Sequence, residues 1–201
     1  MSGQLPKRRA QYALALWALA RGRPEAFRLF GGEGRDYLNS LAPLLAFSLV
    51  ISALDVLSGH KAQGASLFLS SLCGLLAPPV IAEPLCRRWG CLDRWALFSN
   101  MMNWVQILMA PVMVAVLLAA ALLVSAGLPL LLTTLILMLA VLSYVTWLQW
   151  FSARGALGLT RWRTVKLLFA IQLGTGLLMA LQMQTSGGSF VPPGLSRQFQ
   201  S

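Results

Sequence analysis

The chain has 201 residues, of which 57% are hydrophobic and only 11% are charged, and its net charge is +10. Charged residues make up roughly 25% of an ordinary soluble protein, so this composition excludes that class. The basic residues cluster in short segments beside apolar runs, so membrane topology and anionic headgroups explain the positive charge, and we expect no nucleic-acid partner.

Residues 1–38 are expected to form a cytoplasmic segment with one or two interfacial amphipathic helices. Leu16 and Leu19 share an apolar face of the first helix, and a second short helix beginning at Pro24 presents Phe27 and Phe30. A basic start followed by a short apolar core also fits a signal peptide. The arginines that follow this core directly favour the interfacial helix.

The lengths of the apolar segments predict a membrane domain at 39–184, which is an all-α bundle of five transmembrane helices. A flexible tail is predicted at 185–201. Apolar segments of about 20 residues each cross a bilayer once. Pro43 is expected in the first turn of the first span, and Pro78-Pro79 is expected to kink or break the second. The predicted spans are 41–57, 62–82, 102–124, 129–151 and 165–183.

The third and fourth spans are predicted from a run of 59 residues, 95–153, that contains no Asp, Glu, Lys, Arg or His. This run is long enough for two helices and a turn. Gly127 suits the end of the first helix and Pro129 the start of the second. The apolar half of the third span after Pro111 is expected to face lipid.

The distribution of positive charge predicts the orientation. Fourteen of the sixteen Lys and Arg residues fall on the side of the N-terminus in this topology. Cytoplasmic loops are enriched in Lys and Arg, so the N-terminus is predicted to be cytoplasmic and the C-terminus outside. All seven Trp residues lie near the same side, which predicts a thick, structured interface there. Richness in Ala, Leu, Gly and Arg suggests a bacterial inner membrane.

Motifs for catalysis and metal binding do not occur. The single histidine, His60, lies on the outer side, so HExxH zinc chemistry, bis-histidine haem and a Ser-His nucleophile lack their residues. Cys73, Cys86 and Cys91 show no paired spacing, and the chain has no Gly-x-Ser-x-Gly elbow or Gly-rich phosphate loop. We therefore predict a non-enzymatic protein without cofactor-binding or metal-binding residues.

Polar side chains within spans are candidates for function because they are costly in lipid. Asp55 could form an ion or proton site, or it could pair with Lys61 near the outer end of its span. Glu83 could form an ion site in a broken helix, or a surface ion pair with the following arginines. The amides are expected to form hydrogen bonds between helices. The candidates are Asp55, Glu83, Asn100, Asn103, Gln106, Gln149 and Gln172.

Small residues recur every four positions on two spans and make ridges that another helix can approach closely. Such ridges pack within one chain, or they dock a partner membrane protein or a second copy. Basic and aromatic residues before the last span are predicted to contact anionic headgroups. The ridge residues are Ser66, Ser70, Gly74, Gly176 and Ala180, and the headgroup residues are Arg154, Arg161, Trp162 and Arg163.

Residues 24–183 combine a basic, aromatic lead-in at 24–30, five closely spaced helices, and a short Arg/Gly-containing loop at 154–163. This plan resembles the Yip1-domain family of five-span membrane proteins. The Asp-Leu-x-Gly-Pro motif of eukaryotic members is absent, so the resemblance assigns no residue a role. It implies a non-enzymatic protein of membrane organisation or trafficking.

Two functions are therefore considered. The first is a non-catalytic membrane protein that organises or binds other membrane components through its ridges and its cytoplasmic basic surface. The alternative is a small transporter or channel subunit with a polar path along Asp55, Glu83 and Gln172.

Overall fold

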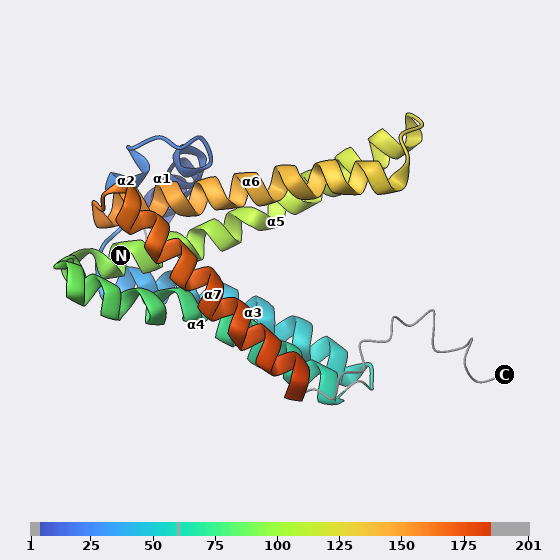
Figure 1. The fold of residues 1–201 in the computed structure, drawn as a ribbon, viewed down its shortest axis with the longest axis horizontal. Helices are drawn as coiled ribbons and strands as arrows, with labels where there is room; N and C mark the ends of the chain where they lie inside the picture. Colours follow the sequence, from blue (N-terminus) through green and yellow to red (C-terminus); the bar gives the residue numbers. More distant parts are fainter. Residues whose placement is uncertain (1–4, 60, 186–201) are drawn as a thin grey trace.

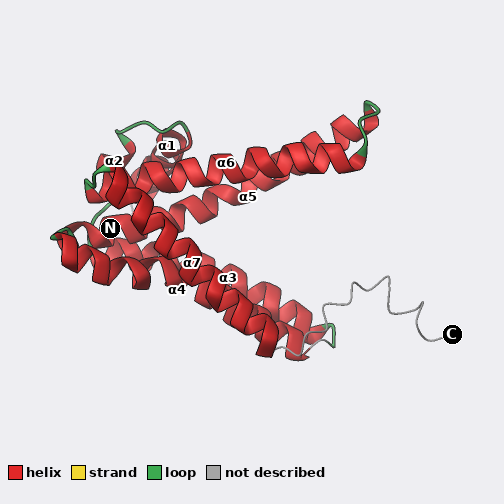
Figure 2. Ribbon diagram, viewed as in Figure 1, coloured by secondary structure: helices red, strands yellow, loops and turns green. Residues whose placement is uncertain are grey.

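The structure, a computed structural model, describes residues 5–59 and 61–185, and within these ranges it contains helices and no strand (Figure 2). Five helices, α3 to α7, are long and apolar enough to cross a membrane, so the predicted all-α, five-span class is confirmed. The elements are α1 (Leu5–Ala20), α2 (Ala26–Leu29), α3 (Gly34–Leu57), α4 (Lys61–Trp89), η1 (Leu92–Arg94), α5 (Trp95–Ser125), α6 (Leu130–Leu157) and α7 (Arg161–Thr185).

The helices form two arms that diverge from a common end (Figure 1). One arm is the α5–α6 hairpin, and the other contains α3, α4 and α7. We call the common end the base. It holds α1, α2, the connection between α4 and α5, and the turn between α6 and α7. The three basic segments, which are the N-terminal segment and the connections after the second and fourth spans, therefore lie at the same end of the bundle, as predicted.

The helices continue beyond the predicted spans into the base. The 31 residues of α5 extend about 46 Å, whereas the hydrocarbon core of a bilayer is about 30 Å thick. The basic loop predicted at 154–163 is wrong, because α6 and α7 are separated only by residues 158–160. Gly158, with φ of 65°, ends α6 in the left-handed conformation that glycine adopts easily.

Prolines lie inside two helices without ending them. The helix α3 begins at Gly34, where the side chain of Asp36 caps it: Asp36 Oδ2 accepts a hydrogen bond from the backbone N–H of Glu33 at 3.4 Å. Pro43 therefore lies in the third turn of α3 and not in its first. Pro78-Pro79 was expected to kink or break the second span, and the break is wrong, because α4 continues as one helix through Pro78, Pro79 and Pro84. Neighbouring groups can satisfy backbone atoms near a proline within a bundle, which makes such prolines tolerable.

A buried core fills the base. Its fully buried members include Leu19 of α1, Phe98 of α5, Leu148 of α6 and Leu167 of α7, so four helices contribute to one core. The Tyr12 ring of α1 stacks on Trp104 at 5.1 Å between ring centroids. The N-terminal helices are thus packed parts of the base, and the Trp-rich interface expected there is a folded layer.

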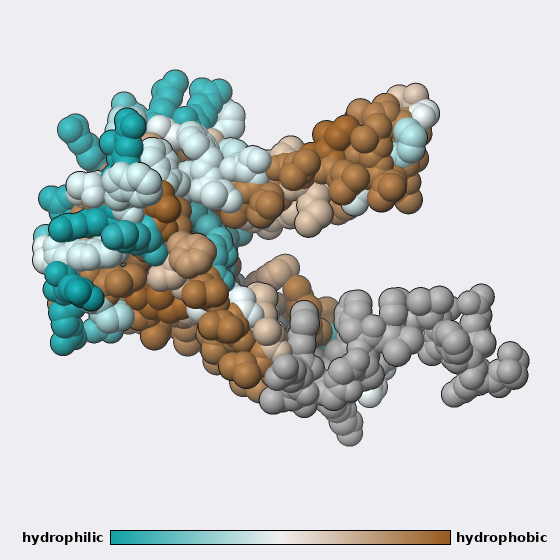
Figure 3. Space-filling model, in the orientation of Figure 1, coloured by the Kyte–Doolittle hydropathy of each residue, from teal (hydrophilic) through white to brown (hydrophobic). Residues whose placement is uncertain are grey.

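The α5–α6 hairpin is exposed over most of its length. Leu117, Leu118 and Leu122 of α5 are 63–70% exposed, as are Leu131 and Leu139 of α6 at 73% and 62%. The space-filling view shows this arm as a hydrophobic projection separated from the other arm by an open notch (Figure 3). The half of α5 after Pro111 therefore presents an apolar surface suited to lipid, as its sequence predicts.

Glycines mark where helices approach closely. A Cβ at Gly64 of α4 would lie 2.7 Å from the backbone oxygen of Ser52 in α3, and a Cβ at Gly174 of α7 would lie 2.5 Å from Ile81 Cδ1 in α4. A Cβ at Gly176 would meet nothing within 4 Å. On α7, Gly174 therefore faces a packed interface, whereas Gly176, two residues further along, faces open space.

Alanine substitutions at Gly64 and Gly176 should change stability in opposite directions. Gly64→Ala forces α3 and α4 apart, and overpacking of this kind costs about 1–3 kcal/mol. Gly176→Ala gains up to about 1 kcal/mol because alanine is the better helix former. Thermal unfolding of the purified protein in detergent measures both, and a shift of the melting temperature in the same direction for the two variants would contradict this packing.

Candidate functional site

The candidate site is a groove between α6 and α7 where these helices diverge from their three-residue turn. We call it the α6–α7 groove; its volume is about 770 Å³. Residues at helical spacing form each wall, because positions three and four apart share a face. The walls include Ser143, Trp147 and Trp150 of α6 and Val165, Phe169 and Gln172 of α7.

A hydrogen bond between amides bridges the groove. Gln172 Nε2 donates to Gln149 Oε1 at 3.0 Å, and both side chains line the groove. Two amide side chains carry four N–H hydrogens, and this bond uses one of them. The structure thus brings together two of the predicted intramembrane polar residues and leaves the pair with spare hydrogen-bonding capacity at an exposed position.

Two arginines flank the end of the groove that is nearest the turn. The Arg154 guanidinium lies 5.2 Å from the ring centroid of Trp150, a wall residue. Arg161 lies one helical turn before Val165 on the same face of α7. Arg163 instead lies over Trp89 of α4, at 6.0 Å from the ring centroid. The predicted headgroup residues therefore divide between the groove and another part of the base.

Trp162 and Gln106 are exposed, and neither lines the α6–α7 groove. The Trp162 side chain is 78% exposed at the start of α7, as a residue at headgroup level would be. Gln106 is exposed on α5 and does not belong to the buried polar group of that helix.

Asn100 and Asn103 fix the N-terminal segment to α5. Asn103 Nδ2 donates to Ser40 Oγ at 2.9 Å, and the Ser40 hydroxyl donates to the backbone oxygen of Tyr37 at 2.8 Å. Asn100 Nδ2 donates to the backbone oxygen of Gly31 at 2.8 Å. Both asparagines are fully buried, so these amides hold the α2–α3 region against α5 in the base.

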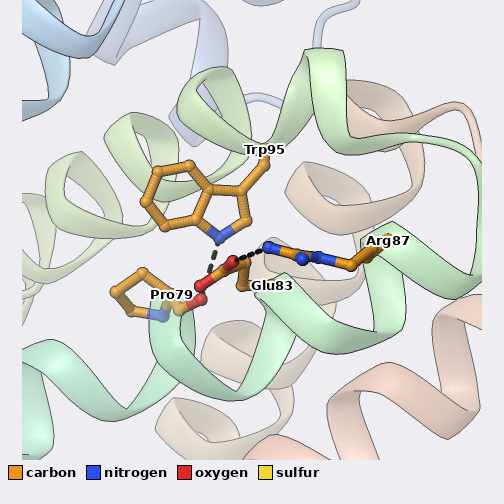
Figure 4. Close-up of polar contacts among 4 residues, drawn as sticks. All are labelled: Pro79, Glu83, Arg87 and Trp95. Atoms are coloured by element: carbon orange, nitrogen blue, oxygen red, sulfur yellow. Dashed lines mark hydrogen bonds and ion pairs between the residues drawn. The ribbon is translucent and has the colours of Figure 1, made fainter.

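Glu83 forms a surface ion pair. Its Oε1 accepts a hydrogen bond from Arg87 Nη2 at 2.8 Å, and the two side chains are 46% and 71% exposed (Figure 4). Nearby, Trp95 Nε1 donates to the backbone oxygen of Pro79 at 2.8 Å and joins α5 to α4. An exposed pair of this kind contributes little to stability. Glu83 therefore belongs to the surface of the base, beside Pro84 and Arg88.

Asp55 lies far from this pair. It is half-buried near the end of α3, close to the level of Gly64, whereas Glu83 is 19 residues further along α4. At 1.5 Å per residue these acidic groups are about 28 Å apart along the helix. The structure does not gather Asp55, Glu83 and Gln172 into one site. His60 and the side chain of Lys61, the suggested partner of Asp55, lie outside the described residues.

The predicted ridges face different surroundings. Gly74 of α4 faces α7, where a Cβ would lie 4.0 Å from Met179 Cε, and Ser66 and Ser70 are half-buried on the same helix. Gly176 and Ala180 of α7 are exposed, and this row extends the groove wall that ends at Gln172. One ridge therefore packs mainly within the chain, and the other is open.

Helical spacing relates further residues to the groove and the base. Trp147 and Trp150 are three residues apart on α6, and Phe169 lies three residues before Gln172 on α7, so spacing places each on the groove face of its helix. At Gly155, the missing Cβ makes room for the ring of Phe27 from α2. Among the described residues, no group of three or more His, Cys, Asp or Glu side chains is placed to hold a metal ion.

Comparison of the chain with protein-family models, curated proteins and solved structures finds no match. The fold and the site are therefore interpreted from the chain itself.

A double-mutant cycle should reveal the Asn103–Ser40 hydrogen bond. Asn103→Ala and Ser40→Ala each remove one partner, and we expect a coupling free energy of about 0.5–1.5 kcal/mol between them. Unfolding in detergent measures the four proteins of the cycle. Gln106→Ala, on an exposed position of the same helix, should change stability by less than about 0.5 kcal/mol. Additive effects of the two alanines would show that this bond does not couple α3 to α5.

Proposed function

We propose that this protein is a non-catalytic multi-pass membrane protein that organises or binds other membrane components, with a partner membrane helix or a second copy of the chain as occupant of the notch. The observation that supports this most is the open small-residue face of α7, at Gly176 and Ala180. In lipid, helices associate through close van der Waals packing, which small residues permit.

The divergence of the arms supports the same proposal. The most apolar 18-residue window of the α5 span has no residue buried inside the protein, and that of α6 is 6% buried. Beyond the base, these two long helices pack mainly against each other and leave their other faces exposed. The hairpin therefore presents apolar surface to its side of the notch, where a partner helix can contact it together with the other arm.

We further propose a bacterial inner membrane as the location, with the base and the N-terminus in the cytoplasm. Hydrophilic residues gather at the base (Figure 3), which holds the three segments rich in Lys and Arg. This supports the orientation, because cytoplasmic segments are enriched in Lys and Arg. A Yip1-like membership would agree with this arrangement. The resemblance is based on the order and character of the helices.

Bulk added at Gly176 should weaken assembly without unfolding the protein. Gly176→Leu places a side chain where a partner would approach, and an overpacking cost of about 1–3 kcal/mol corresponds to a loss of affinity of about fivefold to 150-fold. The complex is extracted in mild detergent, and its mass is measured by size-exclusion chromatography with light scattering.

The matched control is Ala65→Leu, which adds similar bulk at an exposed position of α4. Its complex should have the mass of the wild-type complex. The proposal is wrong if the wild-type chain elutes only as a monomer, or if Gly176→Leu assembles as well as the wild type. The melting temperature of each variant separates lost assembly from lost folding.

Reporter fusions test the orientation. A green fluorescent protein fused after Gly158 should be fluorescent, because this reporter matures in the cytoplasm. Alkaline phosphatase fused after Thr185 should be active, because it requires the outer compartment to form its disulfides. The opposite pattern of activities would reverse the proposed topology.

A further inference from the structure

We propose that the α6–α7 groove binds one anionic phospholipid, with its phosphate between Arg154 and Arg161 and an acyl chain along Trp147 and Phe169. This inference goes beyond the proposed function, because it names a lipid site that needs no protein partner. It is based on two cations at one end of a groove whose walls are mainly apolar and aromatic.

The end nearest the turn is cationic. Arg154 is exposed and is held over Trp150, whereas Arg161 is exposed at the first position of α7. Their helices are joined by residues 158–160 alone, so the two guanidinium groups belong to neighbouring ends. Guanidinium groups bind phosphate oxygens through paired, charge-assisted hydrogen bonds. A phosphodiester at this end would contact both helices.

A bridge of uncharged amides crosses the groove, between Trp150 and Trp147 on α6 and after Phe169 on α7. Gln149 and Gln172 are bridged at 3.0 Å and keep three N–H hydrogens for other acceptors. From Arg161 to Gln172 the rise along α7 is about 16 Å, and from Arg154 to Gln149 along α6 it is about 8 Å. The amides therefore lie further from the turn than the two cations, where they can donate to oxygens of a bound lipid.

Apolar and aromatic side chains lie on both sides of this bridge. Trp147, Leu142 and Phe169 line the groove, and the Phe169 side chain is 68% exposed. A volume of about 770 Å³ falls within the range of about 300–1,000 Å³ that is usual for small-ligand sites. A free phosphate ion would contact only the cationic end. A partner helix would have to supply a negative charge opposite the two arginines. Every anionic phospholipid carries such a charge in its headgroup.

The test uses the full chain in detergent, with dioleoyl phosphatidylglycerol and dioleoyl phosphatidylcholine as probes. Native mass spectrometry counts the lipids retained by each protein. We expect one phosphatidylglycerol per chain, bound more tightly than phosphatidylcholine. Arg154→Gln combined with Arg161→Gln should weaken phosphatidylglycerol binding by about 30-fold, since each cation near an anionic headgroup contributes about fivefold.

The control combines Arg88→Gln with Arg163→Gln, which removes the same charge from other parts of the base. This pair should retain phosphatidylglycerol within about twofold of the wild type, because it leaves both groove cations in place. Equal binding of the two lipids by the wild type, or an equal loss in both charge pairs, would overturn the proposal. Displacement of the lipid by inorganic phosphate would also overturn it and would indicate a free-anion site.

The lipid test and the assembly test can fail separately. Arg154 and Arg161 are exposed and lie at the end of the groove away from Gly176, so their double variant should keep the wild-type complex mass. Lost lipid selectivity with normal assembly would overturn the lipid site alone. Normal lipid selectivity with no complex would overturn the proposed partner binding alone.

Discussion

The structure depends on one buried core at the base, because only there are the two arms joined. Phe98 of α5, Leu148 of α6 and Leu167 of α7 are fully buried in it, and Leu19 of α1 completes it. Removing apolar side chains from water stabilises a packed core. Removing them from lipid does not, because lipid tails are as apolar as leucine. The base is therefore held closed, whereas the arms in the hydrocarbon have no penalty for diverging.

The same constraint explains how the polar side chains are distributed. In the base, Asn100 and Asn103 are fully buried and bind the chain's own Gly31 and Ser40. Where the arms diverge, Gln172 has only Gln149 as a described hydrogen-bond partner and remains exposed. The amides of α5 thus serve the fold, and the amide pair of the groove is left for contacts outside it.

The five spans and the shared side of the basic segments followed from hydropathy and charge alone, but the arms and their groove did not. Hydropathy ends a span where polar residues begin, so it placed Arg154 in a loop although hydrogen bonding continues α6 to Leu157. Pro78-Pro79 predicted a kink or a break, yet α4 continues as one helix through Pro79. The divergence of α6 from α7 depends on tertiary packing in the base, which no local pattern encodes.

Gly174 and Gly176 show why the small-residue pattern was ambiguous. Both belong to closely spaced rows on α7, but Gly174 faces Ile81 and Gly176 faces open space. Gly176 lies one turn beyond Gln172, about 6 Å along the helix. A lipid in the groove and a helix at Gly176 would therefore touch on one face of α7. Any contact between them would couple their affinities equally in both directions, because binding linkage is reciprocal.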